Sequence, residues 1–377
     1  MDVKILKEGR PGILNKEHIL SLEGEVITDL TKETIGPSAF DLHLSHQGWE
    51  MQGSIKGSDS TLIEEIGEKY GRRFSIEDKK KLEAKKTYVF KLRESLKIPP
   101  YGRLYGKATG RSSIGRLDVL TRLMVDYCSL YDEIEPKEGF YPGRLYLEVT
   151  PITFGIEVQE GASLSQLRLF RGDPELSELK ASEIELFGEM ILDENRQPKT
   201  TEKLYELRVD LTPDPKNNIS AFRAKKDKDL VVDLTKEEKH YNPKDFWEEV
   251  SLNIDSPLKI EPERFHILRS KERFKLPRDI AVYCQAVSET IGELRIHYAG
   301  FVHPGFGSTR PKEGTPIIFE VRGHNVDTFL RDGETLAHIK FYRMSEPCTP
   351  DSLEKEKKSE YEKQELRLSS YFEDWSQ

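Results

Sequence analysis

The sequence predicts a mainly β protein built from two tandem copies of one unit, each an antiparallel β-barrel or β-sandwich. Three observations lead to this fold class: short runs of alternating apolar and polar residues, an internal duplication, and a length of 377 residues. Alternation with a period of two is typical of strands that face a core on one side. The length is sufficient for two units that each bury a core of their own.

Period-two runs recur along the chain between glycine and proline residues. The strands expected from them are Tyr88–Leu92, Arg144–Val149, Gly155–Val158, Leu164–Phe170, Ile280–Cys284, Leu294–Tyr298, Thr315–Val321 and Leu336–Tyr342. Helices are expected only at the periphery. They are Lys16–Leu22 after Asn15, Thr61–Lys86, Pro243–Val250 after Asn242, and Ser352–Leu366.

The duplication is read from matches that keep the same order in both copies. Pro99 matches Pro277 at an offset of 178, and the strand Leu145–Val149 matches Ile317–Val321 at an offset of 172. Small steps in the offset are what loop insertions and deletions produce between two copies of one unit. We therefore expect four segments: an N-terminal lobe over 1–171, a connecting region over 172–239, a C-terminal lobe over 240–345 and a charged tail over 346–377.

Composition excludes several classes of protein. Charged residues make up 33% of the chain, and the net charge of −9 disfavours binding to nucleic acid. No stretch approaches the roughly 20 apolar residues that span a membrane, and the N-terminus lacks the apolar core of a secretory signal. Cys128, Cys284 and Cys348 are odd in number and widely separated, which argues against disulfides and structural zinc. We expect a cytoplasmic protein.

The run Gly110–Arg116, Gly-Arg-Ser-Ser-Ile-Gly-Arg, places two guanidinium groups and two hydroxyls on one short turn. Arginine presents a rigid fork of donors that fits phosphate oxygens, and serine hydroxyls fill further acceptor sites. The motif predicts a site for an anionic small molecule, with a solvated turn between two strands as the alternative. Residues 288–293 of the second copy read Ser-Glu-Thr-Ile-Gly-Glu. Both cations are replaced there, so we expect that copy to repel an anion.

Glu148 is the candidate for acid–base chemistry. It lies on an apolar strand between Leu147 and Val149. A carboxyl group that is partly desolvated can have its pKa raised towards neutral pH, where it serves alternately as base and acid. The alternative is a strand glutamate that faces solvent. Glu320 is the matching residue of the second copy, and both remain candidates.

Several motifs in a fixed order carry a family resemblance. Gly110–Arg116, the Glu148 strand and Gly161–Leu167 together resemble the dCTP deaminase branch of the dUTPase-like superfamily, in its long two-repeat form. Pro37–Leu44 is similar to that family's N-terminal Ser-x-Asp-Leu-x-Leu strand, with one extra residue between its serine and aspartate. The resemblance implies two tandem distorted β-barrel (β-clip) lobes and a homotrimer with sites between neighbouring lobes.

The same resemblance implies a reaction and its residues. The expected reaction is the hydrolytic deamination of dCTP to dUTP and ammonia, in pyrimidine deoxynucleotide metabolism. The implied roles are proton shuttle for Glu148, a place near the attacking water for Ser112, charge stabilisation for Arg116, and substrate binding for Arg111, Ser113 and Gln166.

The nucleoside-holding hairpin of the superfamily is matched better by residues 297–307 than by the first copy. It would contribute Ala299, Gly300 and His303 to substrate binding, with His303 where the hairpin usually carries aspartate. On this hypothesis the first copy supplies the phosphate side of a site, the second copy supplies the base side, and Glu320 is the catalytic carboxyl.

Zinc deaminases hold their metal with a His-x-Glu segment and a Pro-Cys-x-x-Cys segment. This chain has no Cys-x-x-Cys, so we expect a zinc-free mechanism in which Mg²⁺ arrives with the triphosphate. Two other functions stay open. One is dUTP diphosphatase, alone or together with deamination, although residues 352–377 lack the glycines of its phosphate-clamping tail. The other is a nucleotide-binding regulator without catalysis.

Overall fold

Two compact units make up the chain in a computed structural model. The model describes residues 9–98, 103–135, 141–199, 204–214, 217–227, 229–253, 255–286, 294–296 and 300–375. The first unit comprises Met1–Glu178, Lys228–Thr235 and Tyr342–Ser352, and the second comprises Leu179–Asp227, Lys236–Phe341 and Leu353–Gln377. The segment expected to connect the lobes is thus shared between the two units.

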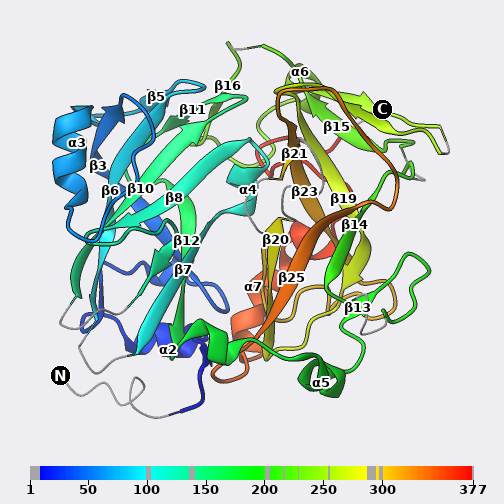
Figure 1. Cartoon of the computed structure of the whole chain (residues 1–377), viewed down its shortest axis with the longest axis horizontal. Coiled ribbons are helices and arrows are strands. Elements are labelled where there is room, and N and C mark those ends of the chain that lie inside the picture. The colour runs from blue at the N-terminus through cyan, green and yellow to red at the C-terminus, as the bar shows by residue number, and fades with distance from the viewer. Residues whose placement is uncertain are drawn as a thin grey trace. The chain divides into compact units, whose positions relative to one another are not determined.

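The first unit consists mainly of strands (Figure 1). Its strands are β1 (Gly12–Ile13), β2 (Ile27–Thr28), β3 (Phe40–Met51), β4 (Gly71–Ser75), β5 (Lys80–Leu82), β6 (Thr87–Ile98), β7 (Leu104–Gly110), β8 (Val119–Val125), β9 (Glu133–Ile134), β10 (Tyr141–Pro151), β11 (Gly155–Val158), β12 (Ser163–Arg171) and β16 (Val231–Asp233). Its helices are α2 (Lys16–Ser21), α3 (Ile63–Tyr70), α4 (Ser112–Gly115) and the 3-10 turns η1 (Lys32–Thr34) and η2 (Pro174–Ser177).

The second unit is also mainly β. Its strands are β13 (Ile191–Leu192), β14 (Glu206–Asp210), β15 (Ala221–Ala224), β17 (Trp247–Val250), β18 (Leu258–Ile260), β19 (Phe265–Phe274), β20 (Ile280–Ala286), β21 (Leu294–Ile296), β22 (Phe301–Val302), β23 (Thr315–Gly323), β24 (Thr328–Leu330) and β25 (Thr335–Arg343). Its helical segments are α5 (Ala181–Ile184), η3 (Glu185–Phe187), α6 (Pro243–Phe246), η6 (Asp351–Leu353), α7 (Glu354–Lys358) and η7 (Glu360–Lys363). The last residues of β25 and the first of η6 belong to the first unit.

The two units share one strand order, which confirms the predicted duplication. Among the described residues the main sheet of the first unit runs β8-β10-β6-β3-β12-β7-β9. The second runs β21-β23-β19-β14-β25-β20-β22, with β15 and β17 added beside β19. Glu148 pairs with Val89 in the first unit, and Glu320 pairs with Ile267 in the second. The two glutamates are 172 residues apart and their two partners are 178 residues apart, which are the same offsets that the sequence comparison gave. The fold is therefore mainly β, with two barrel-like sheets, as the sequence predicts.

A buried glutamate occupies the same place in each sheet. Glu94 on β6 accepts a hydrogen bond from the backbone N–H of His43 at 2.9 Å, and Glu272 on β19 accepts one from the backbone N–H of Arg208 at 2.7 Å. Each N–H lies where the pairing of its strand shifts register, between β3 and β12 and between β14 and β25. A register shift of this kind leaves a backbone group without a ladder partner, and the carboxylate supplies that partner.

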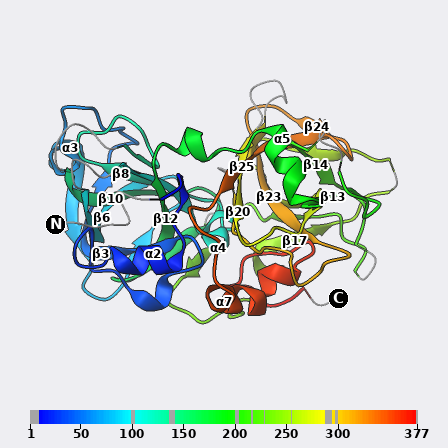
Figure 2. The same cartoon turned by 90° about the horizontal axis from the view of Figure 1, so that it is seen from below.

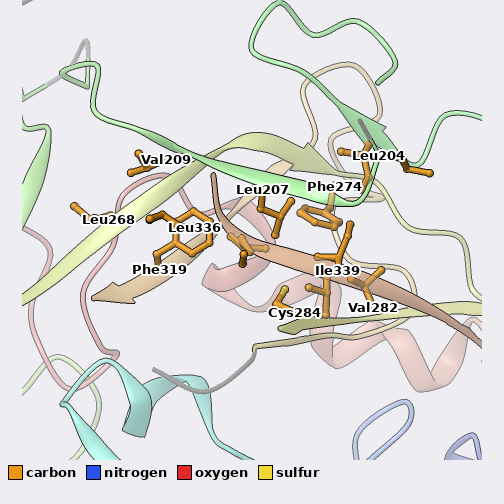
Figure 3. Close-up of a cluster of buried hydrophobic side chains, with 14 of the residues drawn as sticks. Leu204, Leu207, Val209, Leu268, Phe274, Val282, Cys284, Phe319, Leu336 and Ile339 are labelled. Atoms are coloured by element: carbon orange, nitrogen blue, oxygen red, sulfur yellow. The ribbon is translucent and has the colours of Figure 1, made fainter. Parts of the chain in front are cut away.

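The apolar core of the second unit is formed by side chains from β14, β19, β20, β23 and β25. Phe274, Leu207, Phe319 and Ile339 are among the residues that point into it (Figure 3). Figure 2 shows α3 beside the strands of the first unit. Its Ile63 and Ile66 pack in a cluster with Trp49 of β3. Within the part of the chain that the structure describes, no helix has the length and apolar character needed to cross a bilayer.

Every strand predicted from period two is present, although residues 297–298 of the run ending at Tyr298 lie outside the described part. The prediction of a helix over 61–86 is wrong beyond Tyr70, because the chain continues there as strand β4, which pairs with β3. The exposed Arg72 and Arg73 of β4 give this strand the polar sequence of a charged helix. The helix after Asn242 ends after one turn, and Trp247–Val250 pairs with β15 instead.

Removing the charge of Glu272 tests the role of the buried carboxylates. It contacts the Lys199 Nζ at 3.2 Å and the Arg208 Nε at 2.8 Å. Glu272→Gln therefore removes the counter-charge of the buried Lys199 and leaves Arg208 with Glu194 as its remaining carboxylate partner. Disrupting a buried ion pair of this kind typically costs several kcal/mol. We expect urea unfolding to show the second unit destabilised by about 3 kcal/mol.

The matched control is Glu334→Gln in the same unit, where the residue is exposed. Its free energy of unfolding should stay within about 0.5 kcal/mol of the wild type. If the Glu272→Gln transition overlays that of the control, the carboxylate does not hold the register.

Candidate active site

The Arg-Ser-Ser motif joins β7 to β8 through the single turn of α4. Ser112 begins the turn and is exposed, Ser113 is half-buried, and Arg116 is buried at its end. The backbone N–H of Arg116 donates to the Ser112 carbonyl at 3.2 Å, which closes the turn. The two serines therefore lie on a short, hydrogen-bonded turn that is open to solvent at Ser112 and partly open at Ser113.

The register shift of β12 positions Arg111. The Arg111 backbone N–H donates to the Leu164 carbonyl at 3.0 Å, and its guanidinium NH1 reaches the Ser163 carbonyl at 3.5 Å. Ser163 is the residue paired with His43, whose N–H is held by Glu94. The buried carboxylate thus holds β3 opposite the part of β12 that Arg111 contacts.

Asp41 connects two of the predicted substrate-binding residues. Its Oδ2 lies 3.4 Å from the Arg111 NH1, and its Oδ1 accepts a hydrogen bond from the Gln166 Nε2 at 2.9 Å. The Gln166 Oε1 accepts in turn from the Arg168 NH2 at 3.3 Å. The Asp41 side chain is 8% exposed and that of Arg111 is 40% exposed, so a buried acceptor orients a guanidinium that still faces solvent.

Glu148 occupies a covered position on β10 and is 5% exposed. Its Oε1 accepts from the Ser54 hydroxyl at 2.8 Å, and its Oε2 accepts from the Tyr131 hydroxyl at 3.3 Å. Burial raises the pKa of the Glu148 carboxyl, against the opposing effect of these hydrogen bonds. Burial also raises the pKa of Tyr131 to about 12, so Tyr131 remains a donor at neutral pH.

Sequence reasoning missed the two residues that cover Glu148. Ser54 lies in the loop between β3 and α3, and Tyr131 lies in the loop between β8 and β9. Neither residue belongs to a run that recurs in both copies. Contacts made by loop residues leave no periodic signal in the sequence, so these two could not be predicted. Asp41 was within reach of sequence analysis, because it lies in the segment Pro37–Leu44, which resembles the Ser-x-Asp-Leu-x-Leu strand of the family.

In the second unit Glu320 occupies the register position of Glu148 but is half-buried. Residues 288–293 and Ala299 lie outside the described residues. Gly300 accepts a hydrogen bond from the Cys284 N–H at 2.9 Å through its carbonyl. His303 packs edge-on against Phe306, and its Nε2 lies 3.7 Å from a carboxylate oxygen of Glu356.

Two family models match the chain, one in each half. The model described as the N-terminal domain of 2′-deoxycytidine 5′-triphosphate deaminase matches residues 10–173, and that of the C-terminal domain matches residues 179–372. The chain belongs to the dCTP deaminase family. The crystal structure of the dCTP deaminase from Agrobacterium tumefaciens is similar, with a TM-score of 0.80 and 30% identity over 89% of this chain and 96% of that one. No curated protein sequence matches the chain.

Membership of the dCTP deaminase family confirms the recognition made from the motifs. Within the first unit, the structure brings Arg111 and Gln166 to one carboxylate, that of Asp41. Glu148 instead contacts Ser54 and Tyr131. Arg111 and Glu148 thus have different polar partners among those described in the first unit.

The raised pKa of Glu148 predicts a pH-dependent stability. A carboxyl whose pKa is higher in the folded state stabilises the fold fully below its unfolded pKa, near the ordinary value of 4.5. This contribution is lost as the pH rises through the folded pKa. Glu148→Gln fixes a neutral side chain of the same shape, so we expect a higher thermal midpoint than wild type at pH 7 to 8.

The gain should disappear near pH 4, where the wild-type carboxyl is protonated. Glu65→Gln, at an exposed position on α3, serves as the control. Thermal unfolding followed by circular dichroism across this pH range measures both variants. A Glu148→Gln protein that is less stable than wild type at pH 8 would contradict the assignment of a raised pKa.

Proposed function

We propose that the protein is a hydrolase that converts dCTP and water to dUTP and ammonia. The observation that carries the proposal is the match of both halves of the chain to dCTP deaminase domains, together with an intact Arg-Ser-Ser turn in the first. In this reaction water adds at C4 of the cytosine ring, a proton is delivered to N3, and the amino group leaves as ammonia.

The triphosphate is bound by the Arg-Ser-Ser turn. Arg111 presents a half-exposed guanidinium held by Asp41, and the Ser113 hydroxyl adds a donor beside it. A fixed guanidinium fork suits phosphate oxygens because little side-chain freedom remains to be lost on binding. Mg²⁺ belongs to the substrate here, since it enters with the triphosphate.

We assign the proton transfer to Glu320. Glu148 is almost completely covered by its own unit, so a substrate would have to displace Ser54 and Tyr131 before Glu148 could exchange a proton with it. Glu320 holds the same register position and is half-buried, which leaves part of its surface available to a substrate. A carboxyl in such partial burial can alternate between base and acid near neutral pH.

Ser112 and Arg116 complete the proposed chemistry. Ser112 is the exposed first residue of α4, where its hydroxyl can orient the attacking water and the amino group. The buried Arg116 supplies a fixed positive charge to stabilise the negative charge that develops on the ring. The assembly as a homotrimer and the cytoplasmic location are parts of this proposal that rest on the family resemblance and composition.

Diphosphatase activity is the second candidate, alone or beside deamination. A mobile Gly-rich tail that clamps phosphates would favour it, but residues 352–377 contain no glycine. Leu368 and Phe372 of this segment are buried in the second unit. We therefore favour deamination.

Incubation with dCTP and Mg²⁺, followed by separation of the nucleotides, tests the proposed function. We expect dUTP and one equivalent of ammonia. Formation of dUMP and pyrophosphate from dUTP would support diphosphatase activity instead, and tight binding of dCTP without turnover would support a regulator. No loss of dCTP at micromolar protein concentration would end the proposal.

The assignment of the carboxyl is tested by two matched variants. Glu320→Gln should lower kcat by at least about a hundredfold, because proton transfer by a positioned group typically contributes 10²–10⁴-fold. Glu148→Gln should retain kcat within about threefold. The reverse result would move the proton transfer to Glu148, and full activity in both variants would exclude either carboxyl.

A further inference from the structure

The C-terminal segment 353–375, which we name the strap, is anchored in the second unit by a buried carboxylate. Glu362 is 1% exposed. One of its oxygens accepts from the Gly307 N–H at 2.9 Å, and the other accepts from the Thr309 N–H at 3.1 Å and the Thr309 hydroxyl at 3.2 Å. Gly307 adopts a φ of 73°. A Cβ there would lie 1.8 Å from the Phe274 carbonyl oxygen, so only glycine fits this turn.

A second carboxylate of the strap joins two arginines. Glu365 accepts from both NH groups of Arg273 and from the Arg310 NH1 at 2.8 Å. Burial opposes ionisation of Glu365, but the hydrogen bonds and charges of these arginines outweigh it and lower its pKa to about 2. Arg273 also donates through its Nε to the Glu313 carbonyl at 2.8 Å. The strap is therefore cross-linked to the loop that precedes β23.

The same segment holds the first residues of β23, the strand that carries Glu320. The Thr315 hydroxyl donates to the Glu362 carbonyl at 2.6 Å, and the Gln364 Nε2 donates to the Pro316 carbonyl at 3.0 Å. These contacts lie on the strand that leads directly to Glu320.

The two ends of the strap are fixed as well. Near its start, Leu353 packs against Gly305, and Glu356 faces His303. Towards its end, Phe372 packs on Trp247 at a ring distance of 6.1 Å, and Trp375 packs on Phe222 at 5.0 Å. The sequence predicted a helix over 352–366, but α7 ends at Lys358 because the residues after it make these individual contacts.

We propose that the strap positions the active carboxyl, with Glu362 as the positioning residue that holds segment 303–316 and the start of β23. The inference rests on the proposed function of Glu320. Its physical basis is that the two oxygens of the Glu362 carboxylate accept from three donors at once. The amide of Glu362→Gln would turn an N–H₂ donor towards either the Gly307 or the Thr309 N–H, so one contact must be lost.

Glu362→Gln and Glu354→Gln in the full chain form a matched pair. Glu354 is exposed and contacts only Lys357 among the partners described for it. Two measurements are made: amide hydrogen exchange of segment 303–316, and the separate kcat and KM for dCTP. In Glu362→Gln we expect exchange about tenfold faster and kcat about tenfold lower, with KM within about twofold of wild type. Glu354→Gln should match wild type in both.

The two readouts separate this inference from the proposed function. An inactive wild-type protein would overturn the function, and hydrogen exchange would still decide whether the strap holds the segment. Unchanged exchange in Glu362→Gln would overturn the strap, and faster exchange with unchanged kcat would overturn the positioning role. If Glu362→Gln does not fold, Glu365→Gln replaces it under the same criteria, because Glu365 is 32% exposed and joins the strap to Arg310 of the same segment.

Discussion

The arrangement of each unit depends on a buried carboxylate that accepts a backbone N–H where two strands shift register. Glu94 in the first unit and Glu272 in the second have this role. A buried N–H without a partner costs roughly 1 to 3 kcal/mol, so the shift would not be stable without an acceptor at that place. In the first unit Leu164, at the register shift, accepts from the Arg111 N–H through its carbonyl, and this contact positions the start of the Arg-Ser-Ser turn.

On this shared framework the two copies have diverged in chemistry. The first keeps Arg111 and Arg116 and covers its carboxyl, Glu148, with side chains of its own loops. The second has lost both cations and keeps Glu320 half-buried on a strand whose start is held by the C-terminal strap. Duplication allows such differences to accumulate, because each unit carries its own copy of these positions.

Much of the framework is predictable because it depends on local and periodic features. Alternation predicts the strands, and the offsets of 178 and 172 between the two copies reproduce the observed pairing of Glu148 and Glu320. Edge strand β4 escaped prediction because its exposed arginines resemble a charged helix face. The covering of Glu148 by Ser54 and the contacts of the strap depend on residues distant in sequence, which no pattern records. Glu94 and Glu272 could have been found, since their offset of 178 is that of the matched prolines.

We propose that the chain carries one working carboxyl, Glu320 in the second unit. A crystal structure with dCTP bound to an inactive variant, Ser112→Ala, tests this most directly. Our account predicts the cytosine amino group and N3 within hydrogen-bonding distance of Glu320, with Glu148 still bonded to Ser54 and Tyr131. A cytosine bound against Glu148, with the loop of Ser54 displaced, would contradict it.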